Sequence, residues 1–419
     1  MTVGESKEPW LAKMPSNWAI RRIKDIAELK CGDGITSESI TPVGDFPVFG
    51  GNGLRGYTTS FTHEGHYVLI GRQGALCGNI NYAKGKFWAS EHAVVVSKIG
   101  KIDTYWLGES FRDMNLNQYS NAAAQPGLAV DRIKFLCMPV PPLEEQQRIA
   151  AYLDASCAAI DAAVTAKCRQ LETLDVVRGG IIETAITSGL NARTKHSRID
   201  QDWIGSLPEH WMATRIKRVV SRVDYGISVS TESEGKYPVL KMGNIQAGEI
   251  VFSKIEFVDE VIDELLLETN DLLYNRTNSP DRVGKAALFR GTKDDSVTFA
   301  SYLVRLRVNH RIIPEFLSYA VNCGGFLAFA RKLAIPSVQQ SNLNSTRYCR
   351  MLIPLPPVCE QHAICEHLDT KVEELKRVAC TIEAQIATLT SYRQSLIHEC
   401  VTGQRRISVA DVNRAKDTR

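Results

Sequence analysis

The sequence lacks the signatures of most enzyme classes. Its 419 residues contain no GxxxxGK[ST] phosphate loop, no HExxH metal-binding helix and no GxSxG nucleophile turn. The 11 cysteines are odd in number and include no CxxC pair, which favours reduced thiols over a disulfide framework. No apolar run approaches roughly 18 residues, and the N-terminal MTVGESKEPW has no signal-peptide core. These absences predict a non-catalytic protein of the cytoplasm, without a membrane span.

Strong charge of either sign is missing as well. The formal net charge is only +3, and 44% of the residues are hydrophobic, which is ordinary for a globular chain. Composition alone therefore does not indicate a nucleic-acid partner. A binding surface for an anion has to come from local clustering.

One long segment occurs twice in the chain. Pro141 to Thr187 opens as PPLEEQQRIAAYLD, and Pro356 to Thr402 opens as PPVCEQHAICEHLD, at a constant offset of 215 residues. Two prolines followed by a carboxylate are typical of a helix start. Apolar residues then recur at helical spacing, as with Leu153 and Leu368, over several heptads. Each copy predicts one long helix, and the duplication favours mutual, antiparallel pairing of the two.

The repeat covers nearly the whole chain. WLAKMPSNWAIRRI at 10–23 returns as WIGSLPEHWMATRI at 203–216, followed in both copies by short β-type runs that are bounded by Gly, Asn and Pro turn signals. The fold class is therefore α+β, with two mixed α/β domains joined by two long, coiled-coil-like helices in a pseudo-twofold repeat. The predicted parts are a domain at 1–140, a helix at 141–188, a linker at 189–202, a domain at 203–355, a helix at 356–403 and a frayed tail at 404–419.

Two constellations resemble chemical sites but fail on physical grounds. GGNGLRG at 50–56 has GxGxxG spacing, yet no amphipathic helix follows it, so we interpret it as a tight turn. Cys359, His362, Cys365 and His367 lie on less than three turns of one predicted helix and cannot close a tetrahedron around zinc. We expect no bound metal and no cofactor of the chain's own.

Polar loops recur at corresponding places in the two copies. Arg72 and Gln73 follow the run VLI, and Arg276, Thr277 and Asn278 follow LLY. Arginine can bridge guanine O6 and N7, and an amide can bridge adenine N6 and N7. The loops predicted to bind DNA carry Asn52, Arg55, Tyr57, Arg72, Gln73 and Gln125 in the first copy and Arg276, Thr277, Asn278, Gln339 and Gln340 in the second.

This alternation of a variable segment with a PPLEEQQRIAAYLD-like helix, twice, resembles the specificity subunits of type I restriction-modification systems. FPVFGGNGLRGY, VLIGRQGALCGN and the paired MPSNW and LPEHW support the resemblance. It implies that each domain is a target recognition domain reading half of a bipartite sequence in double-stranded DNA. It also implies two methyltransferase subunits as partners, and restriction subunits where the system cleaves. S-adenosylmethionine, and ATP with magnesium, then belong to those partner subunits.

The resemblance assigns the long helices two tasks, spacing the domains and binding the methyltransferase. About 45 residues at 1.5 Å give a rod of roughly 67 Å, against about 34 Å for one turn of duplex. The helix residues predicted to meet partner subunits are Ile149, Tyr152, Leu153, Val177, Ile364, Leu368 and Tyr392. Gly179 and Gly180 predict a close helix approach or a bend. The alternative is a coiled-coil scaffold whose globular ends bind other proteins.

Overall fold

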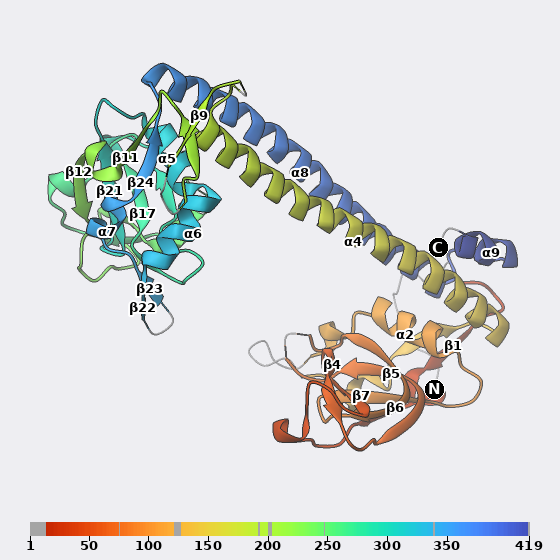
Figure 1. Ribbon diagram of the computed structural model, residues 1–419. Coiled ribbons are helices and arrows are strands. Elements are labelled where there is room, and N and C mark those ends of the chain that lie inside the picture. The colour runs from red at the N-terminus through yellow and green to blue at the C-terminus, as the bar shows by residue number, and fades with distance from the viewer. Residues whose placement is uncertain are drawn as a thin grey trace. The chain divides into compact units, whose positions relative to one another are not determined.

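The structure is a computed structural model that describes residues 14–74, 76–120, 127–191, 193–199, 203–246, 248–337 and 340–417 (Figure 1). Contacts divide the chain into two compact units. Unit 1 comprises residues 1–169 and 382–419, and unit 2 comprises residues 170–381. Each unit therefore combines one globular domain with one end of each long helix.

The two long helices are α4 (Leu143–Ser188) and α8 (Val358–Val401). In unit 1 they run antiparallel, because Asp161 Oδ1 lies 3.0 Å from Arg393 Nε while the earlier Tyr152 ring faces the later Arg405 at 5.3 Å. In unit 2 Ile186, near the end of α4, shares a core with Ile364, near the start of α8. The predicted fold class, two mixed domains with two antiparallel helices, is confirmed.

The globular domain of unit 1 is built on a six-stranded sheet in the order β2-β7-β5-β6-β3-β4. All neighbours are antiparallel except β3 and β6. Helix α2 covers one face of the sheet and, with Trp106 and Phe111, joins it to the long helices in one core. The strands are β2 (Ala27–Cys31), β3 (Phe46–Gly50), β4 (Gly53–Thr58), β5 (His63–Gly71), β6 (Ile80–Ala89) and β7 (Ala93–Lys98), with β1 (Ala19–Arg22) paired to β8 (Cys137–Val140); the helices are α1 (Ile23–Ile26), α2 (Thr104–Asp113) and α3 (Val130–Ile133).

The globular domain of unit 2 repeats this plan with shorter strands. Its central sheet has the order β12-β21-β17-β19, in which β12, β21 and β17 correspond to β2, β7 and β5. The main strands are β11 (Met212–Arg215), β12 (Val220–Tyr225), β13 (Tyr237–Leu240), β16 (Glu256–Val258), β17 (Leu272–Asn275), β18 (Thr277–Asn278), β19 (Ala286–Leu288), β20 (Thr298–Phe299), β21 (Leu303–Val308), β22 (Ile335–Ser337), β23 (Gln340–Asn342) and β24 (Leu352–Leu355). Two short strands, β14 (Ile245–Gln246) and β15 (Glu249–Ile250), and the helices α5 (Pro314–Asn322), α6 (Gly324–Leu333) and α7 (Ser345–Arg350) complete it.

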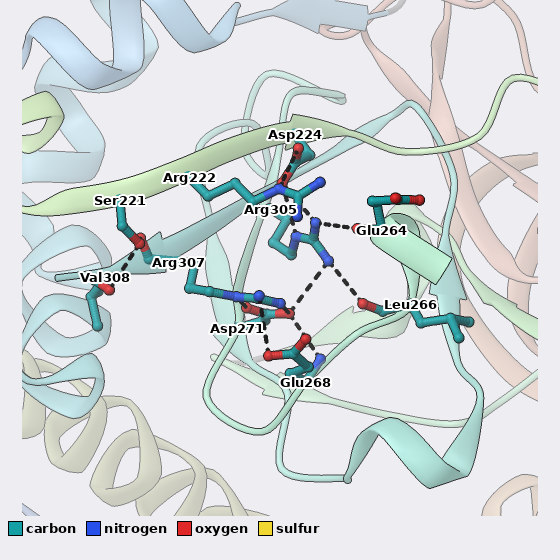
Figure 2. A network of polar contacts seen from close by, with 10 residues as sticks. All are labelled: Ser221, Arg222, Asp224, Glu264, Leu266, Glu268, Asp271, Arg305, Arg307 and Val308. Atoms are coloured by element: carbon teal, nitrogen blue, oxygen red, sulfur yellow. Dashed lines mark hydrogen bonds and ion pairs between the residues drawn. The ribbon is translucent and has the colours of Figure 1, made fainter. Parts of the chain in front are cut away.

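A buried ionic network replaces apolar packing in unit 2 (Figure 2). Arg305 on β21 is fully buried, and its Nη2 lies 2.7 Å from Asp224 Oδ2 while its Nη1 donates to the Leu266 carbonyl over 2.8 Å. Asp271 accepts from Arg307 Nε over 2.8 Å, and this bond raises the pKa of the Arg307 guanidinium. By strand register, the position of Arg305 in unit 1 belongs to Val95, which packs against Leu69. Removing one partner of a buried ion pair is strongly destabilising, because it leaves the other charge uncompensated.

Both ends of the second copy differ from the prediction. Residues 404–417 are not a frayed tail, since α9 (Val409–Asp417) packs Val412 into the core of unit 1 and Arg406 pairs with Glu145 over 2.8 Å. The linker also carries structure, because β9 (His196–Arg198) pairs with β10 (Ser206–Pro208). The helix α9 and the strands β9 and β10 were not predicted because these segments are too short to give a periodic signal.

The glycines of α4 are not a point of close approach. A Cβ added to Gly179 or Gly180 meets no atom within 4 Å, and α4 is continuous through both residues. The same helix contains an 18-residue window of mean hydropathy 1.3, which by length and composition alone could cross a membrane. Its apolar side chains Ile149, Leu153 and Ile160 lie in the core of unit 1, and 39% of the apolar window is buried.

Candidate nucleic-acid interface

Four backbone segments of unit 1 converge at the end of β5. Gly71 can only be glycine there, because an added Cβ would lie 2.3 Å from the carbonyl oxygen of Gly51 in the β3–β4 turn. Arg72 N–H donates to the His92 carbonyl over 2.8 Å, and the Arg72 carbonyl accepts from Leu128 N–H over 2.8 Å. Close contact between glycines of the GGNG and LIGRQG sequences thus brings two loops together. The segments of His92 and Leu128 hold the backbone of Arg72 from either side.

The side chains at this junction form a polar cluster. Arg72 Nη1 donates weakly to the Glu91 carbonyl over 3.5 Å, and Gln73 Oε1 lies 3.0 Å from His92 Nδ1. His92 Nε2 lies 3.1 Å from Glu91 Oε1. Gln73 is exposed, while Arg72, Glu91 and His92 are half-buried. The cluster offers guanidinium donors and amide and carboxylate acceptors, the groups that read base edges.

Unit 2 holds Arg276 in the same frame. Arg276 N–H donates to the Tyr302 carbonyl over 3.0 Å, and its carbonyl accepts from Leu343 N–H over 2.8 Å. Its Nη1 donates to the Ser301 carbonyl over 3.2 Å, while its guanidinium lies 5.0 Å from the centre of the Tyr225 ring. The buried Nε of Arg276 has no hydrogen-bond partner among the described residues. Arg72 and Arg276 are therefore equivalent in their main-chain environment and differ in the side chains around them.

The other predicted residues are distributed around these two arginines. Asn52 and Arg55 are exposed in and after the β3–β4 turn, and Tyr57 is half-buried on β4. In unit 2 the two predicted loops meet in a small sheet, where Thr277 pairs with Asn342.

Within that sheet, Thr277 accepts from Asn342 Nδ2 over 2.9 Å. Asn278 is buried, with its Nδ2 3.4 Å from the Met242 carbonyl, and Gln340 is half-buried. Asn278 thus supports the loop more than it faces solvent. Gln125 and Gln339 lie outside the described residues.

Sequence reasoning missed four members of the two clusters. Glu91 and His92 in unit 1 occupy the turn before β7, and Ser301 and Tyr302 in unit 2 occupy the turn before β21. In the sequence each turn lies inside a single β-type run, FWASEHAVVV at 87 and TFASYLVRLRV at 298. The signal available was the polar pair inside each run, Glu91 with His92 and Ser301 with Tyr302.

The helix residues predicted to meet partner subunits separate into two groups. Val177 is 44% exposed on α4 and Tyr392 is 51% exposed on α8, so both are accessible in this structure. Five others are buried in the chain's own cores, because each globular domain covers the first turns of its long helix: Ile149, Tyr152, Leu153, Ile364 and Leu368. Their burial gives these five a role in holding the domain to the helix.

Comparisons with known proteins agree with this geometry. Residues 15–172 match the family described as the type I restriction modification DNA specificity domain. The EcoprrI specificity subunit of Escherichia coli is 45% identical over 138 residues, 32% of this chain and 34% of that protein. The EcoBI specificity subunit of Escherichia coli is 23% identical over 388 residues, 84% of this chain and 78% of that protein. The first of these matches thus spans about a third of the relative's length.

A solved structure extends the likeness to the whole fold. A chain from a study of complex assembly and conformational transition of the type I R-M system superimposes with a TM-score of 0.69 at 16% identity. The superposition covers 94% of this chain and 99% of that chain. It supports the fold, two mixed domains with two long helices. Residues 15–172 thus match the type I restriction modification DNA specificity domain, and the chain is similar in sequence to type I restriction enzyme specificity subunits.

Proposed function

We propose that this chain selects the DNA sequence on which a type I restriction-modification complex acts. The observation that carries the proposal is the equivalence of Arg72 and Arg276, each held by three main-chain carbonyl or amide contacts of the same kind in its own unit. A guanidinium has five N–H donors, so the single bond to a carbonyl leaves donors for guanine O6 and N7.

The neighbours of the two arginines support two different half-sites. Gln73, Glu91 and His92 surround Arg72, whereas Thr277, Ser301 and Tyr302 occupy the corresponding positions beside Arg276. Carboxylates accept from cytosine N4, and amides pair with adenine, while a tyrosine ring contacts bases chiefly through its face. The two units share one main-chain arrangement around the arginine but carry different side chains beside it. This supports a bipartite target in which each unit reads one half.

The long helices have a separate role in this proposal. Stiff helices spanning both units set the number of unread base pairs between the half-sites. Val177 and Tyr392, exposed on α4 and α8, provide apolar contact points for methyltransferase subunits, two by the repeat of the chain. The proposal places catalysis, with S-adenosylmethionine, on those subunits, and places the complex in the cytoplasm with DNA.

A domain exchange tests the proposal. Residues 14–140 are replaced by the matching domain of a related subunit, and the complex with methyltransferase is expressed in cells whose methylated bases are then mapped. We expect one half of the methylated sequence to change while the other half and the spacer persist. A change in both halves contradicts the division of reading between the units. The reciprocal exchange of residues 203–355 is the matched control and should alter only the other half.

A further inference from the structure

A patch of cations is repeated in both units beside the proposed reading sites. In unit 1 Arg22 and Lys24 flank the buried Ile23, and in unit 2 Arg215 and Lys217 flank the buried Ile216. The two segments are structurally equivalent, because Ile23 N–H donates to the Leu136 carbonyl over 3.0 Å and Ile216 N–H to the Met351 carbonyl over 3.1 Å. All four cationic side chains are exposed.

A third cation is repeated on the short helix before the last strand of each domain. Arg132 on α3 and Arg347 on α7 are both exposed, and they stand at the same offset as the long helices. We call the set the basic stripe: Arg22, Lys24 and Arg132 in unit 1, and Arg215, Lys217 and Arg347 in unit 2.

The basic stripe is continuous with the reading site of each unit. Leu128, whose N–H donates to the Arg72 carbonyl, leads directly into α3. The backbone carbonyl of Lys134, at the end of α3, accepts from Lys24 N–H over 2.9 Å. In unit 2 Leu343, whose N–H donates to the Arg276 carbonyl, leads in the same way into α7, and the Met351 carbonyl after α7 accepts from Ile216 N–H over 3.1 Å.

The cations on either side of Ile23 and Ile216 keep their positive charge. No described carboxylate lies within ion-pair distance of Arg22, Lys24, Arg215 or Lys217, and in unit 1 Asp131 pairs with Lys134 instead. Asp25 also lies on α1 of unit 1, where unit 2 carries Arg218. The positive charge is therefore a property of both patches, strongest in unit 2.

We propose that the basic stripe binds the DNA phosphate backbone and fixes the register of each reading site on the duplex. The inference rests on the proposed function. Residues that differ between the units suit different bases, whereas cations that are repeated suit a partner that is the same at both half-sites. The apolar neighbour Phe135, 51% exposed in unit 1, is not repeated, since Arg350 occupies its position in unit 2. A repeated protein-docking surface would be expected to keep it.

The test compares two doubly neutralised proteins, each in complex with its methyltransferase subunits. One carries Arg22→Gln and Lys24→Gln, and the other carries Arg215→Gln and Lys217→Gln. A control removes two exposed cations of unit 2 outside the stripe, Lys236→Gln and Lys254→Gln. The probe is a random-sequence duplex, and its affinity is measured over a series of salt concentrations.

Each stripe variant should lower the slope of log affinity against log salt by about 1.8, which is about 0.9 for each lost phosphate contact. The preference of the complex for its methylated sequence over the random duplex should stay unchanged. An unchanged slope overturns the inference, and so does loss of methyltransferase association with an unchanged slope, which would make the stripe a protein interface. If the unsubstituted complex itself shows no preference between sequences, the proposed function fails, whereas the phosphate contacts are still read from the slope.

Discussion

The indole Nε1 of Trp18 donates a hydrogen bond to Oε2 of Glu145 over 3.1 Å, and the second copy repeats it between Trp211 and Glu360 over 3.0 Å. The next residue in each helix, Gln146 or Gln361, accepts from a backbone N–H of the domain over 2.9 and 2.8 Å respectively. The Glu-Gln pair that marks each helix start in the sequence is thus the joint between helix and domain. The two joints make matched tests possible.

Replacing Glu145 with alanine should loosen unit 1. The change leaves the Trp18 indole N–H and the Arg406 guanidinium without their buried acceptor, at a cost of about 1 to 3 kcal/mol. Hydrogen exchange should speed up in α9, which follows Arg406. Glu360→Ala is the control, because it should leave α9 protected and loosen unit 2. Equal exchange in the two variants would count against a local joint.

Removing the charge of Arg305 should be the most damaging single change in unit 2. Arg305→Met leaves Asp224 and the buried Asp271 with one cation fewer, and breaking a buried pair typically costs about 3 to 5 kcal/mol. The destabilisation is measured as the loss of amide protection against hydrogen exchange in β17 and β21. Arg222→Met, which pairs with the same Asp224 from a site 38% exposed, should cost at most about 1 kcal/mol. Comparable losses in both variants would show that burial is not the cause.

Replacing Arg72 with alanine should relax one base position. A bidentate contact to guanine discriminates by about 1 to 3 kcal/mol, so affinity should fall for the preferred sequence and much less for others. Binding to a panel of duplexes with single base changes measures this. Arg276→Ala should have the same effect in the other half-site only. Arg72→Ala lowering affinity equally for every duplex would instead assign Arg72 to phosphate.

Replacing Gly180 with alanine should stabilise α4. The added Cβ meets no atom within 4 Å, and alanine is favoured over glycine in a helix by about 1 kcal/mol. The expected sign is a higher midpoint of thermal unfolding. Gly403→Ala is the opposing control, because Gly403 has φ +78° and its Cβ would lie 2.4 Å from Pro15 Cδ. A lower midpoint for Gly180→Ala would indicate a contact at this position in the folded complex.

Thiol labelling of the native chain should separate the cysteines into two classes. Burial raises the pKa of Cys323, Cys365 and Cys400 to about 12, which suppresses the reactive thiolate at neutral pH. The exposed thiols should react while the chain is still folded: Cys137, Cys168, Cys359 and Cys380. Mass spectrometry after brief alkylation counts the modified sites. Early modification of Cys400 would show that the core around α8 opens.

The sequence determined the architecture, because two signals were long and repeated. The starts PPLEEQQ and PPVCEQH each lead into a helix of more than ten turns with apolar periodicity. The bounds of α4 and α8 were therefore predictable to within two residues. The apolar runs VLI and LLY also pointed to Arg72 and Arg276, since each arginine follows such a run at a turn. Short elements such as α9 were not predictable, because two helical turns carry too little periodicity.

Only the tertiary structure decided which side chains act together. Glu91 and His92 come 19 and 20 residues after Arg72 in the sequence, yet main-chain contacts between neighbouring segments place all three in one cluster. It also decided that Ile149 and Ile364 belong to the core, since an apolar stripe looks the same whether its own domain or a partner covers it. Periodicity gives the face of a helix, whereas only packing shows what lies against that face.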